Sequence, residues 1–538
     1  MQQKVNLQLS PAEAADDSAI IGAIARQTGM HSAKVCGFYL LKRSIDARSR
    51  TVRINLTVQA FIEEPFHGRK LMDFAFRDVH NSPLSCVIIG AGPAGMFAAL
   101  RFLEAGIKPV ILERGKEVRA RRRDLAVLNK QGIINPDSNY CFGEGGAGTY
   151  SDGKLYTRSS KRGNIERILN LFVHFGAPDN ILYDAHPHIG TNKLPQIITA
   201  MRKRIMDCGG EFHFEKKVTT LDMHNGELRL VGTADGERFN ADAFILATGH
   251  SARDIFHLLY KKNIDIQAKG FALGVRAEHP QQIIDQIQYG KGQQTTNELK
   301  LPPASYSLVH QAEGRGVFSF CMCPGGIIAP AATADGELVV NGWSPSKRNN
   351  PYANSGLVVQ VEPADVHTYF DSIQHKNYDR KSPLLMMDFQ QEVEKKAFSV
   401  GGGSFVAPAQ RLVDFTQNRI SENLPKCSYQ PGISTAPLQE VLPPFISKRL
   451  QLALRAFGKK MPARNANSGY FTNEAVLVAT ESRTSSPVRI PRDETRLHHP
   501  QVTNLFPCGE GAGYAGGIVS AAMDGERVSE AITVQLKK

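Results

Sequence analysis

The chain has 538 residues, of which 42% are hydrophobic and 22% are charged, as in an ordinary globular protein. No apolar run reaches the roughly 18 residues that span a bilayer, and the N-terminus lacks the basic and apolar regions of a secretory signal. The eight cysteines are too few and too scattered for a disulfide scaffold, so we expect a cytoplasmic protein without membrane association. The net charge of +12 is compatible with anionic cofactors, acidic lipid or nucleic acid.

The first 83 residues are predicted to form a small α+β module. Alternating apolar and polar residues at 4–10 and 51–62 are typical of half-buried strands, and the segment 12–29 between them has helical spacing. The pattern leaves two roles open for this module, namely docking onto the next domain and binding a partner.

The strongest motif is G-x-G-x-x-G at Gly90, Gly92 and Gly95, between a short apolar strand and a helical segment. Gly90 permits the tight turn, Gly92 lets the backbone approach a pyrophosphate, and Gly95 lets the helix pack against the sheet. A second apolar strand follows and ends at Glu113, which we expect to accept hydrogen bonds from the adenosine ribose hydroxyls. Strand, helix, strand and acid in this order predict a dinucleotide site.

Three later segments favour FAD over NAD. A glycine-rich loop at 141–158 can wrap a pyrophosphate or lie along a flat ring, although an ordinary surface loop would also be rich in glycine. The apolar strand within 241–250 runs into an Ala-Thr-Gly turn, which is close to FAD in two-dinucleotide-fold flavoproteins. At 504–532 strand, glycine loop and helix recur, and Glu510 stands where many FAD proteins have an aspartate that holds the ribityl chain. An extended FAD requires this second motif and NAD does not.

The residues that we expect to contact FAD form four groups along the chain. They are Gly90, Gly92, Pro93, Ala94, Gly95, Glu113 and Arg114; Gly145, Gly146, Gly148, Thr149 and Ser151; Val218, Ala247, Thr248 and Gly249; and Gly509, Glu510, Gly516, Gly517 and Ile518. The helix that follows Gly517 would point its positive end at the flavin.

This order predicts an α/β protein with a Rossmann-like FAD-binding domain that is split by a large inserted α+β cap. The expected parts are the N-terminal module 1–83, the first part of the FAD-binding domain 84–270, the cap 271–475 and the C-terminal part 476–538. No second G-x-G-x-x-G with strand-loop-helix context lies in the insertion. NAD(P)H is therefore expected only as a transient electron donor.

Six segments together resemble the bacterial FAD-dependent dehydrogenases that are often labelled NAD-utilising, which are similar in fold to the glutathione-reductase-type flavoproteins. They lie at 87–100, 143–155, 246–254, 319–326, 481–490 and 508–525. The resemblance covers nearly the whole chain, including a match at 42–48, and it implies FAD and redox chemistry without naming a substrate. The chain departs from the family pattern at 332–334 and at Trp343, which leaves substrate preference open.

The flavin would carry the redox chemistry, so the protein's own residues are expected to position and tune it. Arg483 and Arg489 precede the C-terminal FAD motif and are predicted to clamp an acidic substrate or the flavin, with solvated surface arginines as the alternative. His250 follows the Ala-Thr-Gly turn and is predicted to act as acid or base, with a structural histidine as the alternative. The adjacent His498 and His499 lack spaced partners, so we expect no metal.

Cys321 and Cys323 stand one residue apart in the cap, just before Pro324. On a regular strand they would point to one face with Cα atoms about 6.6 Å apart, near the upper limit for a disulfide. The favoured interpretation is two small buried residues that face the core. A flavin-coupled dithiol, the alternative, would need a bent backbone.

The sequence predicts an FAD-dependent oxidoreductase that transfers hydride or electrons between flavin and a small acidic or unsaturated substrate. A flavin-dependent RNA-modifying enzyme and a non-catalytic flavin sensor or interaction protein remain as alternatives. The densest basic run, 119–124, is interpreted as a solvated helix face in which Arg121 pairs with Asp124. No nucleic-acid module is recognisable, so no specific nucleic-acid partner is expected, and nothing indicates the oligomeric state.

Overall fold

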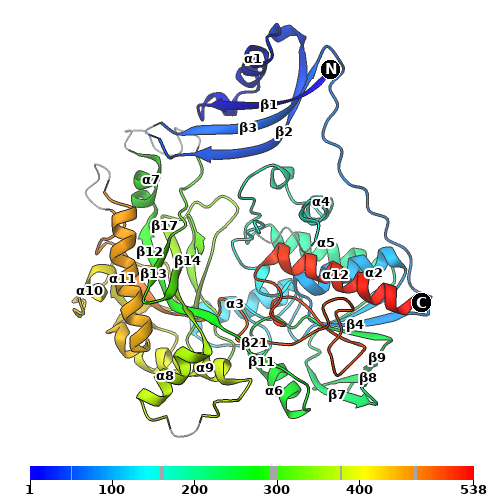
Figure 1. Cartoon of the computed structure of the whole chain (residues 1–538), viewed down its shortest axis with the longest axis vertical. Helices are drawn as coiled ribbons and strands as arrows, with labels where there is room; N and C mark the ends of the chain where they lie inside the picture. Colours follow the sequence, from blue (N-terminus) through cyan, green and yellow to red (C-terminus); the bar gives the residue numbers. More distant parts are fainter. Residues whose placement is uncertain (50, 158–162, 291–300, 376–377, 464–468) are drawn as a thin grey trace.

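A computed structural model describes residues 1–49, 51–157, 163–290, 301–375, 378–463 and 469–538. A small N-terminal module lies at one end of the molecule, and two larger bodies lie side by side below it (Figure 1). One of these bodies is the dinucleotide-binding domain and the other is the inserted cap.

A five-stranded parallel sheet forms the centre of the dinucleotide-binding domain. Its order is β22 (Leu505–Pro507), β10 (Ala243–Leu246), β4 (Ser85–Ile89), β5 (Lys108–Leu112) and β6 (Glu211–His213). The strands are continuous apolar runs because a parallel sheet is covered on both faces. Pairing of β22 with β10 joins the C-terminal segment to the sheet, which confirms the predicted split Rossmann-like fold.

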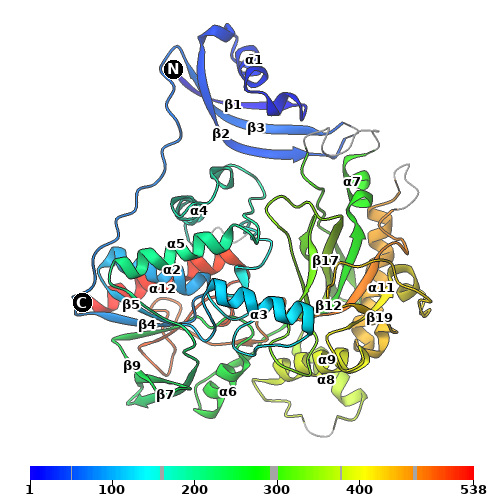
Figure 2. The ribbon, with the colours of Figure 1, turned by 180° about the vertical axis from the view of Figure 1, so that it is seen from behind.

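Two long helices, α2 (Pro93–Ala105) and α12 (Ile518–Leu536), lie side by side on this sheet (Figures 1 and 2). They approach so closely that a Cβ on Gly525 would lie 2.1 Å from the carbonyl oxygen of Ala94. The helix α2 ends at Gly106, which adopts the left-handed conformation with φ 75°, as expected of a glycine C-cap. Both helices therefore begin at the same end of the sheet.

The cap is built on a seven-stranded, mainly antiparallel sheet. Its order is β13 (Val309–Ala312), β14 (Arg315–Cys323), β17 (Tyr352–Val361), β12 (Phe271–Pro280), β20 (Val476–Glu481), β18 (Ala407–Arg411) and β19 (Ile433–Thr435). Helices α9 (Leu385–Val400) and α11 (Pro444–Lys460) bury apolar faces in the same core. The predicted return to the FAD-binding domain at 476 is too early, because β20 pairs with β12 and β18 inside the cap sheet.

The N-terminal module is a three-stranded antiparallel sheet in the order β1 (Gln2–Leu9), β3 (Arg53–Ile62), β2 (Val35–Asp46), packed against α1 (Asp17–Thr28). The sequence pattern did not predict β2, whose pairing with β3 is interrupted by two register shifts. Arg43 pairs with Asp184 of the dinucleotide-binding domain at 2.7 Å, and Leu301 of the cap joins the module's core. The module thus contacts both larger bodies before an extended segment leads to β4 (Figure 1).

The remaining elements surround these sheets. They are α3 (Val118–Gln131), α4 (Ile165–His174), α5 (Leu194–Asp207), β7 (Val218–His224), β8 (Glu227–Thr233), β9 (Arg238–Asn240), α6 (Arg253–Lys261), β11 (Gln267–Ala268), α7 (Gln281–Tyr289), β15 (Ile327–Pro330), β16 (Val340–Trp343), α8 (Pro363–Ser372), α10 (Leu412–Thr416) and β21 (Val488–Arg489), with short 3-10 turns at Glu13–Ala15, Ser32–Lys34, Gly146–Gly148, Asp179–Leu182 and Leu438–Glu440. None of the helices in the described residues has the length and apolar character that crossing a membrane requires.

The basic run at 119–124 lies on α3 and is only partly a solvated face. Its other three arginines are exposed, but Arg121 is fully buried and donates to three backbone carbonyls between 139 and 144. Asp124 pairs instead with Lys116 at 3.0 Å. The predicted Arg121–Asp124 pair is therefore wrong, because the guanidinium points inward and fixes the start of the glycine loop.

Candidate functional site

A cavity of about 330 Å³ lies where the dinucleotide-binding domain meets the cap. Its lining comes from the first glycine turn, the glycine loop, the Ala-Thr-Gly turn after β10, the start of α12 and the cap strands β14 and β16. Of the residues expected to contact FAD, all line this cavity except Gly95, Gly145 and Thr149. Segments that lie hundreds of residues apart in the sequence therefore meet at one site.

Gly95, Gly145 and Thr149 lie behind the surface of the cavity. A Cβ on Gly95 would lie 2.1 Å from the carbonyl oxygen of Gly90, so this glycine permits the close packing of α2 on the turn. Gly145 has φ 76°, and a Cβ there would lie 1.9 Å from Thr149 Oγ1, which donates to the Glu144 carbonyl. These residues shape the wall and do not line it.

The dinucleotide-binding side of the cavity has an open backbone surface, which we call the glycine wall: Gly92, Gly249, Gly516 and Gly517. A Cβ built on the last three would meet no atom within 4 Å, and one on Gly92 would meet nothing closer than 3.9 Å. A large flat or phosphorylated group can therefore lie directly against the backbone here.

The N-termini of α2 and α12 open at this wall, since Gly92 and Gly517 are their N-cap residues. Neither end has a side-chain cap, so the first N–H groups and the positive dipole ends are free for an anion or a polar ring edge. Open glycines and two uncapped helix ends at one cavity fit the diphosphate and the ring of an FAD.

Glu113 has a second task that the sequence did not indicate. Its carboxylate accepts hydrogen bonds from the backbone N–H groups of Ala91, Gly115 and Gly143 at 2.8 to 2.9 Å. It therefore ties three loops together, and Oε2, with one bond in place, keeps one acceptor position. Its predicted contact with the ribose remains a prediction.

Arg114 lines the cavity but its charge is already paired. It lies over the Phe142 ring at 4.2 Å and forms ion pairs with Asp137 at 2.6 Å and Asp254 at 2.8 Å. Two carboxylates thus balance the charge of this guanidinium, and the predicted contact of Arg114 with FAD remains a prediction.

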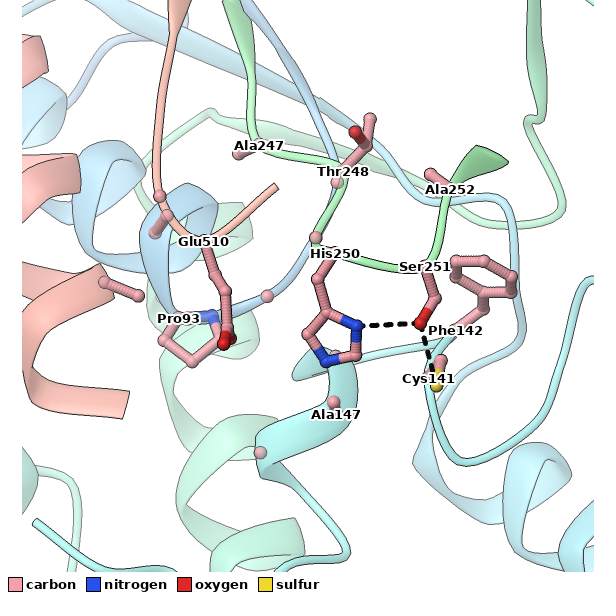
Figure 3. A pocket seen from close by; sticks show the side chains of 18 of the residues that line it. Pro93, Cys141, Phe142, Ala147, Ala247, Thr248, His250, Ser251, Ala252 and Glu510 are labelled. Carbon is pink, nitrogen blue, oxygen red and sulfur yellow. Dashed lines mark hydrogen bonds between the residues drawn. The ribbon is translucent and has the colours of Figure 1, made fainter. Parts of the chain in front are cut away.

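Two titratable side chains face the cavity near the Ala-Thr-Gly turn (Figure 3). His250 Nδ1 lies 2.8 Å from Ser251 Oγ, which lies 3.4 Å from Cys141 Sγ. Burial and the neighbouring Arg483 lower the pKa of His250 to about 4, so the ring is neutral at neutral pH. Burial raises the pKa of Glu510 to about 7, with Lys269 partly opposing the shift.

Arg483 belongs to a buried ion-pair network between the cap and the dinucleotide-binding domain, formed by Arg253, Glu337, Glu394 and Arg483. Arg483 Nη2 lies 3.0 Å from Glu337 and 2.9 Å from Glu394, and Arg253 bonds the same two carboxylates at 2.8 Å. Arg483 Nη1 also donates to Thr333. Arg483 also lines the cavity, so its predicted role as a clamp for an acidic substrate or the flavin remains a prediction, for a guanidinium that is already bound to these partners.

Arg489 does not line the cavity. Its side chain is exposed on β21 and lies over the Tyr514 ring at 5.0 Å, while the preceding Val488 is buried. The prediction that Arg489 reaches the flavin is therefore corrected: strand alternation turns this side chain away from the site.

The cap side of the cavity, which we call the cap wall, consists of Phe320, Cys321, Cys323, Asn341 and Gly342. Cys321 is exposed at this wall with φ 42°, and Cys323 is buried. The prediction of two buried cysteines on one strand face is thus half wrong, because a bulge between Phe320 and Cys323 interrupts the strand. No sequence signal indicates this bulge.

A further ion pair at the cavity is not indicated by any sequence motif. Asp152 of the glycine loop is buried and pairs with Arg348 of the cap at 2.6 Å. Burial alone would raise the pKa of Asp152, but Lys154 and Arg348 outweigh it and lower that pKa. This pair fastens the glycine loop to the cap.

Comparison with known proteins agrees with this arrangement. Residues 84–258 match the family model described as pyridine nucleotide-disulphide oxidoreductase, and 270–484 match the one described as FAD-dependent protein, C-terminal domain-like. Residues 1–61 match a domain of unknown function (DUF8436). FAD is the cofactor, as predicted.

Among solved structures, CtdE in complex with FAD is 9% identical with a TM-score of 0.31, and the match covers 84% of each chain. The 2,6-dihydroxypyridine-3-hydroxylase from Arthrobacter nicotinovorans is 10% identical with a TM-score of 0.35, again over 84% of each chain. An uncharacterized protein from Clostridium beijerinckii is 38% identical over 527 residues, which are 95% of this chain and 94% of that protein. The chain belongs to the same family as this clostridial protein, a family of FAD-dependent flavoproteins with an oxidoreductase-type dinucleotide domain.

Proposed function

We propose that the protein is an FAD-dependent oxidoreductase that passes hydride or electron pairs between the flavin and a small substrate held at the cap wall. The observation that carries the proposal is the meeting of the glycine wall and two uncapped helix N-termini with the cap wall at one cavity. When bound there, FAD supplies the two-electron redox centre.

The proposed cofactor path follows the wall from one helix end to the other. The start of α2, with Gly92 and Pro93, would hold the diphosphate, and Val218 would contact the adenine. The start of α12, with Gly516 and Gly517, would lie at the flavin ring, where its positive end favours the uptake of electrons. The wider relationship to glutathione-reductase-type flavoproteins is part of this proposal.

Proton transfer is assigned to two side chains of the cavity. Glu510, with a pKa of about 7, can both give and take a proton at neutral pH. In the described part of the chain its carboxyl makes no hydrogen bond to another residue, so it is free for the ribityl chain or the substrate. The neutral ring of His250 can accept a proton, while the hydrogen bond between its Nδ1 and Ser251 Oγ fixes the orientation of the ring.

Of the two substrate classes expected from the sequence, acidic and unsaturated, we propose a small unsaturated one, because the cations at the cavity already have partners. Arg483 and Arg114 already pair with two carboxylates each. Lys154 donates to the carbonyl of Met322 and lies 3.9 Å from Asp152. A neutral substrate leaves all of these partners in place.

The proposal is tested on purified protein. We expect close to one FAD per chain, identified by chromatography after denaturation, and anaerobic mixing with NADH or NADPH to bleach the flavin band faster than buffer alone. A protein that retains no FAD even after reconstitution would overturn the proposal. If dithionite reduces the flavin and neither nicotinamide does, the NAD(P)H part fails and another donor must be sought.

A further inference from the structure

We propose that Cys321 and Cys323 form a dithiol–disulfide pair that exchanges two electrons with FAD. The inference rests on the proposed function and adds a second redox centre to the same cavity. Both side chains line the cavity from the cap wall, and the structure records both as free thiols.

The bulge in β14 gives the bent backbone that a bridge between these two residues requires. Phe320 pairs with Gly356 and Cys323 pairs with Asn354, so three residue steps on β14 face two on β17. The segment is therefore compressed relative to a regular strand, on which the two Cα atoms would lie about 6.6 Å apart. Cys323 Sγ lies only 3.2 Å from the carbonyl oxygen of Cys321, so its sulfur sits against the backbone of its partner.

Arg276 holds the pair from behind the cap wall. Its Nη2 group donates to the Cys321 carbonyl at 2.8 Å and to Cys323 Sγ at 3.6 Å. The guanidinium is fully buried, and Glu481 balances its charge at 2.8 Å. A charged donor at Sγ stabilises the negative charge that develops on sulfur as an S–H bond breaks.

Two further contacts fix the segment. Lys154 of the glycine loop donates to the Met322 carbonyl, the residue between the two cysteines. A Cβ on Gly342 would lie 2.2 Å from Arg276 Nη2, so this glycine makes room for the guanidinium at the cavity wall. The cysteine segment is thus positioned by one cation from the cap and one from the loop of the dinucleotide-binding domain.

The step balances with FAD alone as the oxidant. Both S–H bonds break, an Sγ–Sγ bond forms, and two electrons and two protons pass to FAD; reduction of the disulfide by reduced FAD is the reverse. The chain would then hold four electrons per FAD.

The test is an anaerobic dithionite titration of the oxidised holoprotein. We expect four electrons per FAD for the wild type and two for Cys321→Ser and for Cys323→Ser. Cys36→Ser is the matched control, since this exposed cysteine of the N-terminal module lies outside the cavity, and it should keep four.

A second measurement does not involve the flavin. Alkylation of the oxidised, denatured wild type should modify all but two of the eight cysteines, and peptide mapping should find 321 linked to 323; after reduction all eight should react. Two electrons per FAD together with eight reactive thiols in the oxidised protein would overturn the proposal. That outcome leaves FAD binding and reduction intact, so it is distinct from a failure of the proposed function.

Discussion

The two walls of the cavity are built on different principles. The glycine wall offers bare backbone and helix ends, and its shape follows from local turns. The cap wall offers side chains, and its shape depends on ion pairs with residues far away in the sequence, such as Arg276 with Glu481 and Arg483 with Glu337 and Glu394. A wall of the first kind is set by a short motif, whereas one of the second kind needs the whole cap to be folded.

The largest effect is expected on the cap side, from Glu394→Gln. Glu394 is fully buried and accepts from Ser482, Arg253 and Arg483. The variant leaves one carboxylate for two guanidinium groups, that of Arg483, which is buried, and that of Arg253, which is 13% exposed. We expect the free energy of unfolding to fall by about 3 to 5 kcal/mol. Chemical denaturation should show this loss, and Glu392→Gln on the same helix, partly exposed beside His375, should lose less than about 1 kcal/mol.

Glu394 should also affect how the free energy of unfolding depends on pH. Burial would raise the pKa of Glu394, but Arg253 and Arg483 outweigh it and lower that pKa to about 2. The stability that the Glu394 carboxylate contributes is therefore fully present above pH 4.5, its ordinary pKa, and is lost as the pH falls toward 2. Equal losses in Glu394→Gln and Glu392→Gln would contradict the claim that the network holds the cap.

A smaller effect is expected on the other side, from Gly95→Ala. The new methyl group would lie 2.1 Å from the Gly90 carbonyl oxygen, so the turn or the helix must shift, at a cost of about 1 to 3 kcal/mol. Gly22→Ala in α1 is the matched control, because its methyl group would meet nothing closer than 3.6 Å and should stabilise the helix slightly. Thermal unfolding should show a lower Tm than the wild type for Gly95→Ala and an equal or higher Tm for Gly22→Ala. A change in Tm of the same sign in both variants would contradict the packing role of Gly95.

The smallest effect concerns Glu510, whose pKa burial raises from 4.5 to about 7. A raised carboxyl pKa contributes stability below 4.5 that is lost as the pH rises toward 7, and Glu510→Gln should lack this loss. The test is the free energy of unfolding of the two FAD-free proteins, measured between pH 4.5 and pH 8. As the pH rises, the stability of Glu510→Gln should increase relative to that of the wild type. Glu278 and Glu526, whose pKa values burial also raises to about 7, titrate in both proteins and cancel. Parallel curves would contradict a raised pKa of Glu510.

The glycines of the glycine wall could be picked out in the sequence as cavity-lining residues because each part of this wall is local. Gly90 to Gly95 carry their own turn, and the second motif around Glu510 repeats the same strand-loop-helix pattern. The cap was predicted only in outline, since an apolar run such as β20 does not reveal which sheet it joins. The predictions for Arg121 and Cys321 were wrong because their environments come from backbone carbonyls and from a bulge that no short pattern encodes. The carboxylate partners of Arg483 could not be predicted for the same reason.

The central claim, that the glycine wall holds FAD, is tested most directly with Gly92→Ala. Gly92 has φ −75°, and its new methyl group would meet no protein atom closer than 3.9 Å, so the FAD-free fold should be as stable as the wild type. Gly68→Ala, also in open space but outside the cavity, is the matched control. Titration with FAD should give wild-type affinity for Gly68→Ala and at least tenfold weaker binding for Gly92→Ala. Wild-type affinity in Gly92→Ala would contradict the account.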